Sequence, residues 1–388
     1  TCNGDLPVTG SGDSPLALVF SVYFVNWNGF WGEFSEINQD SYSRDKPIKL
    51  ALFNGLSLEG EVMVSVFDDN GVKRIAHQTP QKLDYHIKAL KEMNVNINLD
   101  SGNIIAKGVP KGCDIYFPKK SVGATGNILM AAVKAKGKTI IHNAAKEPEI
   151  LALGDFLIKL GANIKGLGED KITVNPIIND NSEFKFKIIP DRIEAGTFIM
   201  AVAATGGELK LSNVNSEHLK TIIEKMIEIG VYVEDENESI TIKSDKKIKA
   251  ADMETLEYPG FPTDLQAQYM ALMMNAKGKS KIKENIYFDR FTHISELNRM
   301  GGNISLTDNI ATITENDGIC SAPVMCTDIR ASAALIIAAL CAKGKTEISR
   351  IYHIERGYEN IEYKLKKIGA NIERIKSWNI LLHSKWFF

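Results

Sequence analysis

The chain carries an internal repeat of about 68 residues, and this repeat constrains its fold more than any other feature. In each copy a helix-like run ends in an apolar residue, a glycine usually follows, and a strand-like alternation of apolar and polar residues comes next. The five copies begin at Met93, Leu160, Ile229, Met300 and Ile368. Because these starts lie 67, 69, 71 and 68 positions apart, we expect several copies of one supersecondary unit.

A second pattern runs out of phase with the first, and it completes the unit. A helix-like run rich in alanine, methionine and leucine precedes each of four glycines, and a short strand-like segment follows. These glycines are Gly137, Gly206, Gly278 and Gly344. Glycine readily adopts the left-handed conformation that ends a helix, so each unit contains two helices, two glycine stops and a strand hairpin.

The length of 388 residues leaves room for a sixth, shortened or altered copy in the N-terminal stretch. A unit this long is unlike an ordinary solenoid repeat and too irregular for a propeller blade. Four helix-like runs are apolar or small almost all round, as buried helices are, at 128–133, 198–204, 269–274 and 332–340. We therefore expect an α/β (α+β) protein with two domains of three units each, sheets outside and helices within.

The amino-acid composition limits which classes of binding partner and which cellular compartment fit this chain. The 46 basic and 48 acidic residues give a net charge of −2, which does not favour nucleic acid or an acidic membrane surface. The most apolar run, 16–25, is shorter than the ~20 residues of a membrane span, so we expect a buried element there. Five cysteines without metal-binding spacing fit a reducing compartment, and we expect a cytoplasmic protein.

Charged residues at expected helix starts are the candidates for chemistry. In Phe261-Pro262-Thr263-Asp264 a carboxylate could take a proton from a sugar hydroxyl. From spacing alone, we expect Thr263 or Asp264 to cap the helix that begins near Leu265 instead.

Three arginines could grip a small ligand that bears phosphate and carboxylate groups, because a guanidinium binds such oxygens in pairs. They are Arg290, Arg330 and Arg356. Spacing alone favours a simpler arrangement, in which each arginine pairs with its acidic neighbour, namely Asp289, Asp328 or Glu355.

A basic pair followed by serine and glycine could cradle a diphosphate at another helix start. The segment runs from Phe117 through Lys119 and Ser121 to Asn127. Its spacing is not that of a Walker A loop, and similar helix entries are common without a ligand.

These strings together resemble the UDP-N-acetylglucosamine enolpyruvyl transferase (UDP-N-acetylglucosamine 1-carboxyvinyltransferase) family, from about 82 to 375. The strings that carry the resemblance are 121–125, 143–150, 190–198, 261–264, 328–332 and 356–359. The resemblance implies a two-domain inverse α/β barrel of six repeats, of the class that enolpyruvyl transferases share with RNA 3′-phosphate cyclases (EPT/RTPC-like). It places an N-terminal domain at 12–190 and a C-terminal domain at 1–11 and 191–388.

The reaction that the resemblance implies is transfer of an enolpyruvyl group from phosphoenolpyruvate to the 3-hydroxyl of UDP-N-acetylglucosamine. This is the first committed step of peptidoglycan synthesis, and phosphate leaves. The implied enzyme needs no metal or organic cofactor, binds only small-molecule substrates, has no nucleic-acid or membrane partner, and is a monomer.

By the same resemblance, Asp264 is the base that also binds the sugar, and Arg330, Arg356 and Arg290 hold phosphoenolpyruvate and the transition state. The implied uridine-diphosphate cradle comprises Lys119, Ser121, Val122 and Gly123. Ile286 and Asp84 are further implied substrate-binding residues. We expect Asp264 and the arginines to converge on one cleft, although they lie far apart in the sequence.

The N-terminal part departs from the family pattern. The lysine-asparagine pair of the family is absent after Gly10-Ser11, and the segment that carries its proton-donating cysteine is replaced at 67–83. Asp69 is a possible substitute for that donor and Arg74 for a displaced arginine, whereas the alternative is a plain Asp-Asn-Gly turn. These changes leave a second function open, a catalytically impaired family member that binds UDP-N-acetylglucosamine without turnover.

Overall fold

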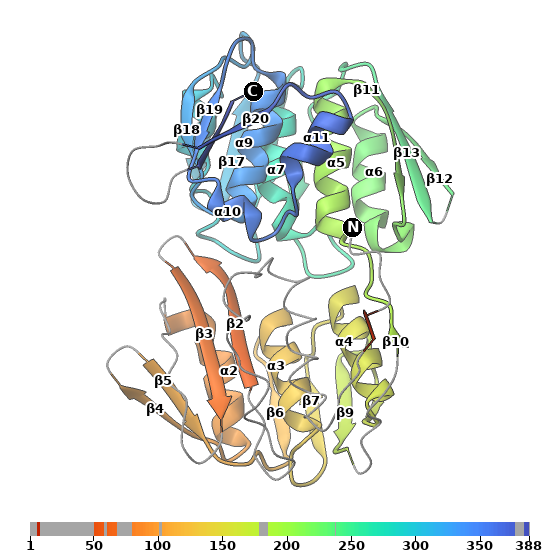
Figure 1. The fold of residues 1–388 in the computed structure, drawn as a ribbon, viewed down its shortest axis with the longest axis vertical. Coiled ribbons are helices and arrows are strands. Elements are labelled where there is room, and N and C mark those ends of the chain that lie inside the picture. Colours follow the sequence, from red (N-terminus) through yellow and green to blue (C-terminus); the bar gives the residue numbers. More distant parts are fainter. Residues whose placement is uncertain are drawn as a thin grey trace. The chain divides into compact units, whose positions relative to one another are not determined.

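The computed structural model describes residues 6–7, 50–57, 60–67, 80–100, 103–177, 185–236, 238–376 and 384–387. The chain divides into two compact units, Thr1–Ile189 and Pro190–Phe388, each drawn in Figure 1. The domain boundaries expected from the resemblance stay predictions. The expected buried element at 16–25 lies outside the described residues.

The first unit consists of three described helices and ten strands. The helices are α2 (Pro80–Glu92), α3 (Val122–Ala132) and α4 (Pro148–Lys159). The strands are β1 (Leu6–Pro7), β2 (Leu50–Ser57), β3 (Gly60–Phe67), β4 (Asn96–Asp100), β5 (Asn103–Lys107), β6 (Asp114–Tyr116), β7 (Thr139–His142), β8 (Asn163–Lys165), β9 (Lys171–Asn175) and β10 (Lys185–Phe186).

The second unit is richer in helices among its described residues. They are α5 (Arg192–Thr205), α6 (Lys220–Glu228), α7 (Gln266–Met273), α8 (Ile294–Arg299), α9 (Ile329–Cys341), α10 (Tyr352–Glu355) and α11 (Ile361–Lys367), with 3₁₀ turns η3 (Ser216–Leu219) and η4 (Thr263–Leu265). The strands are β11 (Gly207–Ser212), β12 (Tyr232–Asp235), β13 (Ser239–Ser244), β14 (Met253–Glu254), β15 (Lys279–Lys283), β16 (Ile304–Thr307), β17 (Ile310–Thr314), β18 (Pro323–Met325), β19 (Glu347–Ser349), β20 (Glu373–Lys376) and β21 (Ser384–Phe387).

The sheets repeat one topology. Three four-stranded sheets have the orders β6-β7-β9-β8, β14-β15-β17-β16 and β18-β19-β21-β20, with the first pair parallel and the other pairs antiparallel. The sheet β11-β13-β12 follows the same order, with no first strand among the described residues. The sheet β2-β3-β5-β4 departs from it, because β2 and β3 are antiparallel and β3 and β5 parallel. The expected count of six copies stays a prediction.

Glycines with positive φ follow the helices at the positions where the sequence predicts glycine stops. Gly137, Gly161, Gly206 and Gly230 all have positive φ, between 77° and 108°, and so do their counterparts in the later copies. In the first copy a left-handed Asn94, with φ 63°, takes the place of the glycine. Gly161 and Gly230 directly follow the C-caps of α4 and α6, so the expected helix stop is confirmed there. Gly137, Gly278 and Gly344 instead lie three to five residues beyond the ends of α3, α7 and α9, in the turn before the next strand.

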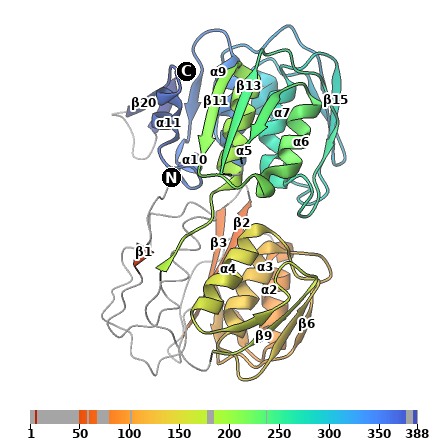
Figure 2. The same ribbon diagram turned by 90° about the vertical axis from the view of Figure 1, so that its right-hand side faces the viewer.

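The buried helices are those expected from the sequence. In the second unit α5, α7 and α9 pack together and are buried along most of their length, and Figures 1 and 2 show them side by side with sheets outside. In the first unit α3 is buried in the same way. Helices thus form the centre of each unit, and the larger sheets pack against them.

We predict that a buried histidine makes the first unit sensitive to acid. The ring of His86 on α2 is 1% exposed, and its Nδ1 lies 2.6 Å from Nδ2 of Asn127 on α3. Burial lowers the pKa of His86 to about 4. The unfolded chain takes up this proton near pH 6.5, so stability falls as pH drops from about 6.5 to 4, by roughly 3 kcal/mol at 1.36 kcal/mol per pKa unit.

The check is urea unfolding of the wild type and His86→Gln across this pH range. Glutamine accepts the hydrogen bond of Asn127 and carries no charge, so its free energy of unfolding should decline less steeply below pH 6.5. Parallel curves for the two proteins would contradict the prediction.

Candidate functional site

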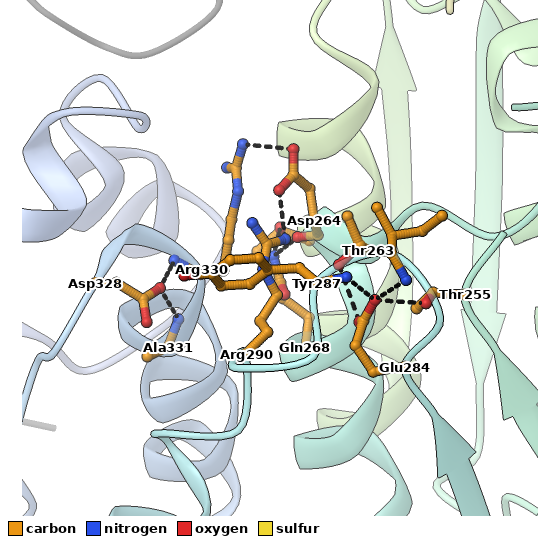
Figure 3. Close-up of polar contacts among 12 residues, drawn as sticks. Thr255, Thr263, Asp264, Gln268, Glu284, Tyr287, Arg290, Asp328, Arg330 and Ala331 are labelled. Carbon is orange, nitrogen blue, oxygen red and sulfur yellow. Dashed lines mark hydrogen bonds and ion pairs between the residues drawn. The ribbon is translucent and has the colours of Figure 1, made fainter. Parts of the chain in front are cut away.

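A carboxylate held by two guanidinium groups is the centre of the candidate site in the second unit. Arg290 Nη1 donates to Asp264 Oδ1 at 2.5 Å, and Arg330 Nη2 donates to Asp264 Oδ2 at 3.3 Å (Figure 3). The side chains of Arg290 and Arg330 are 17% and 14% exposed, whereas that of Asp264 is 33% exposed. Asp264 is therefore the most exposed side chain of the three, although both of its carboxylate oxygens are bound by the arginines.

Helix starts bring these residues together. Asp264 lies in η4, directly before α7, and Arg330 is the second residue of α9. The carboxylate of Asp328 caps α9 by accepting from the N–H groups of Arg330 at 2.8 Å and Ala331 at 2.9 Å. Since α7 and α9 pack together, the site combines arginines with helix N-termini, which favour anions.

The two arginines set the charge state of Asp264. Burial of the carboxyl favours its neutral form, but the charges and hydrogen bonds of Arg330 and Arg290 outweigh burial. They hold the pKa of Asp264 well below the usual range of an aspartate. In this state the carboxylate is ionised and is a weak base.

Two expectations from spacing alone are wrong. Neither Thr263 nor Asp264 caps a helix through its side chain, because both side chains have partners far away in the sequence. Arg290 and Arg330 do not pair with Asp289 and Asp328; both bind Asp264. Tertiary packing, which sequence neighbours do not reveal, decides these pairs.

The third arginine lies on the segment next to Arg330. Arg356 follows α10 and is partly buried, and burial lowers its pKa to about 10. A Cβ on the following Gly357 would lie 2.8 Å from Cγ2 of Ile329 and 3.7 Å from Nη1 of Arg330. Glycine thus lets the backbone beside Arg356 approach the start of α9. The neighbouring Glu355 pairs with Arg374.

A buried polar triangle beneath the site was not found from the sequence. The hydroxyls of Thr197 on α5 and Tyr358 lie 2.8 Å apart, and Nε2 of Gln268 on α7 donates to each at 3.2 Å. The same Nε2 donates to the backbone oxygen of Asp264 at 3.0 Å. Because buried polar groups must be paired, this triangle fixes the start of α7 against α5.

A buried glutamate was also missed, although the sequence contains a signal for it. Ser280 and Ile282 of β15 point inward and the three lysines that alternate with them, at 279, 281 and 283, point outward, so the alternation continues inward to Glu284. Glu284 is fully buried and accepts from the hydroxyls of Thr255 and Thr263 and from two backbone N–H groups.

In the first unit, the expected cradle lies at the start of α3. Ser121 caps this helix, since its hydroxyl accepts from the N–H of Ala124 at 3.2 Å, and Val122 and Gly123 form the first turn. Lys119 is exposed, whereas Lys120 pairs with Asp170 at 3.0 Å. The two lysines therefore differ, and only Lys119 lacks an acidic partner among the described residues.

The remaining expected site residues have separate surroundings. Asp84 is exposed on α2 in the first unit. Ile286 is 43% exposed in the second unit, and its N–H donates to Glu284 at 2.9 Å. Asp69 and Arg74 lie outside the described residues.

Two further features are absent from the described residues, namely a cluster of metal ligands and a membrane-spanning helix. In this part of the chain, no three histidine, cysteine, aspartate or glutamate side chains gather as metal ligands would. In the same part, none of the helices has the length and apolar character needed to span a bilayer.

We predict that Gly196→Ala destabilises the protein by displacing Leu265, the residue after Asp264. A Cβ at Gly196 on α5 would lie 2.4 Å from Cδ1 of Leu265, which is fully buried and follows Asp264. Such overpacking costs about 1–3 kcal/mol, which should appear as a lower melting temperature. The additional change Leu265→Val should restore part of the loss. Full stability of Gly196→Ala alone would contradict the close packing.

The comparisons with known proteins decide the family. A family model described as EPSP synthase (3-phosphoshikimate 1-carboxyvinyltransferase) matches residues 81–365. The chain belongs to the EPSP synthase family. It is similar to the UDP-N-acetylglucosamine 1-carboxyvinyltransferases of Campylobacter lari, at 48% identity over 76% of this chain and 71% of the relative, and Geotalea daltonii, at 46% over 76% and 70%.

These relatives confirm the resemblance seen in the sequence, and solved structures confirm the α/β fold of this family. The enolpyruvyl transferase NikO from Streptomyces tendae matches with a TM-score of 0.66 at 20% identity, over 74% of this chain and 72% of that one. An EPSP synthase from Acinetobacter baumannii matches with a TM-score of 0.56 at 18% identity, over 76% and 73%. At such identities the likeness shows the fold.

Proposed function

We propose that this chain transfers the enolpyruvyl group of phosphoenolpyruvate to the 3-hydroxyl of UDP-N-acetylglucosamine and releases phosphate, the first committed step of peptidoglycan synthesis. One observation carries the proposal: Asp264 and Arg330, at the starts of α7 and α9, form one cluster with Arg290 from the turn before α8. The names of relatives at 46–48% identity support the same reaction. We further propose a cytoplasmic monomer.

The cluster contains the groups that such a transfer requires. A base must take the proton of the sugar hydroxyl as its oxygen attacks C2 of phosphoenolpyruvate, while an acid protonates the methylene carbon. In our proposal Asp264 is the base, and Arg330, Arg290 and Arg356 bind the phosphate and carboxylate. Loss of phosphate from C2 and of a proton from the C3 methyl group, formed by that protonation, then restores the carbon–carbon double bond.

The low pKa of Asp264 gives substrate binding a second role. When phosphate and carboxylate oxygens bind Arg330 and Arg290, they neutralise part of the charge that now stabilises the Asp264 carboxylate. The pKa of Asp264 then rises toward the usual aspartate range, and the carboxylate becomes a stronger base once phosphoenolpyruvate is bound.

The remaining assignments rest on the resemblance. We propose that Lys119 and the N–H groups at Ser121, Val122 and Gly123 bind the diphosphate, in keeping with an exposed lysine beside a helix start. Asp84 and Ile286 would bind the nucleotide-sugar. Because the N–H of Ile286 already donates to Glu284, its carbonyl or side chain would make that contact. We assign proton donation to Asp69 on the sequence alone.

The test is a phosphate-release assay with purified protein. Phosphate should appear only when phosphoenolpyruvate and UDP-N-acetylglucosamine are both present. Thermal stabilisation by the UDP-sugar without phosphate release would favour the impaired binding protein, which the substituted N-terminal residues suggest. Neither release nor stabilisation would refute both functions.

A further inference from the structure

Glu284 links two segments of the candidate site through one buried carboxylate. Its oxygen Oε2 accepts from the hydroxyl of Thr263 at 2.9 Å. Its oxygen Oε1 accepts from the hydroxyl of Thr255 at 2.7 Å and from the N–H groups of Ile286 and Tyr287 at 2.9 Å each. Figure 3 shows the carboxylate between these donors.

The hydrogen bond to Oε2 connects Glu284 to the residue next to Asp264. Thr263 precedes Asp264 in η4, a turn of three residues that no side chain caps. The hydroxyl of Thr263 is therefore a direct connection between the segment that carries Asp264 and the end of β15.

The hydrogen bonds to Oε1 connect Glu284 to Arg290 through Tyr287. The N–H of Tyr287 donates to Glu284, and the carbonyl of Tyr287 accepts from the N–H of Arg290 at 3.1 Å. The guanidinium of Arg290 also lies over the ring of Tyr287, 5.4 Å from its centroid. Glu284 thus fixes Tyr287, and Tyr287 fixes both the backbone and the side chain of Arg290.

Stability alone gives a weak reason for a carboxylate at this position. Burial raises the pKa of Glu284 more than its hydrogen bonds and the charge of Arg290 lower it, which means that the charged form is costly there. Among the described residues, no lysine or arginine contacts Glu284 in an ion pair. Four donors from three separate segments converge on it instead. Such an arrangement specifies geometry, because each oxygen accepts only from donors in fixed directions.

We infer that Glu284 is a positioning residue that holds Asp264 and Arg290 in register for proton transfer and phosphoenolpyruvate binding. This inference rests on the proposed function. Glu284 itself touches no substrate; it acts through Thr263 on one side and Tyr287 on the other.

The decisive variant is Thr263→Val, which keeps the size of the side chain and removes only the hydroxyl that connects η4 to Glu284. Its matched control is Thr255→Val, which removes the other hydroxyl from the same carboxylate but lies outside the segment of Asp264. A misplacement near 1 Å costs about 100-fold in rate, so kcat of Thr263→Val should fall by roughly 10- to 100-fold. Thr263→Ser should restore the rate, and Thr255→Val should lose less than about threefold.

A crystal structure of Thr263→Val provides a readout that does not depend on turnover. The inference expects the contact between Arg290 Nη1 and Asp264 Oδ1 to open from 2.5 Å to a distance beyond hydrogen bonding. Two results would overturn the positioning role. One is an equal loss of kcat in both valine variants, in proportion to their loss of stability; the other is an unchanged ion pair between Arg290 and Asp264 in Thr263→Val. An inactive wild type would refute the proposed function, and the crystal structure would still decide the inference.

Discussion

Replacing Asp264 by asparagine is expected to lower kcat/KM for phosphate release by about 10²- to 10⁴-fold, the usual contribution of a positioned general base. Asparagine keeps the shape, and its Oδ1 can still accept from a guanidinium. Its amide cannot take up the proton of the sugar hydroxyl. The measurement is phosphate release with both substrates present, over a range of UDP-N-acetylglucosamine concentrations.

The matched control is Asp289→Asn, which removes an exposed carboxylate beside Arg290 and should leave the rate within about threefold of wild type. Equal rates for Asp264→Asn and the wild type would refute the assigned base. A loss of the same size in both variants would point to a general effect of charge around Arg290.

The variant Asp264→Asn should also change how the free energy of unfolding depends on pH. Because the pKa of Asp264 is depressed in the folded protein, its ionised form stabilises the fold above the ordinary aspartate pKa of about 3.9. This contribution is lost as pH falls through the lower, folded pKa. Asp264→Asn should therefore be less stable than the wild type at pH 7, and urea unfolding should show the difference narrowing below about pH 4.

What the sequence predicted well was local and repeated. A helix followed by glycine or asparagine in the left-handed conformation depends on neighbouring residues, so the stops at Gly161 and Gly230 could be placed from the sequence. The all-apolar runs could be assigned to buried helices for the same reason, since a helix without a polar face has no side suited to water.

The side-chain partners of the site could not be predicted in this way. The hydroxyl of Thr263 could serve as a helix cap, but its partner is Glu284, which a strand and a helix separate from it in the sequence. Arg330 has an acid two residues away, yet that acid caps α9 and leaves the guanidinium to Asp264. Packing of α7 against α9 brings Arg330 to Asp264, and it was the resemblance, not spacing, that grouped these two residues. Neither spacing nor the resemblance pointed to Glu284.

Arg330 offers a test of whether shape or charge matters more in this cluster. Arg330→Lys keeps the positive charge, but one ammonium group cannot reproduce the planar fork that can reach Asp264 and a substrate anion together. We expect kcat/KM to fall by about 10²- to 10³-fold for Arg330→Lys and further for Arg330→Met, which also loses the charge. The KM for phosphoenolpyruvate should rise, while thermal stabilisation by UDP-N-acetylglucosamine should change little.

The geometry around Arg330 explains why lysine cannot replace it. Arg330 is largely buried at the start of α9, with Gly357 packed beside it. A lysine side chain is shorter, and this packing leaves it no room to move closer to Asp264 and the substrate. The exposed Arg299, which pairs with Glu296 at 3.5 Å, provides the control for an arginine-to-lysine change elsewhere and should tolerate it. If Arg330→Lys kept wild-type kcat/KM, positive charge alone would suffice at this position. The proposal that one guanidinium binds both Asp264 and phosphoenolpyruvate would then be wrong.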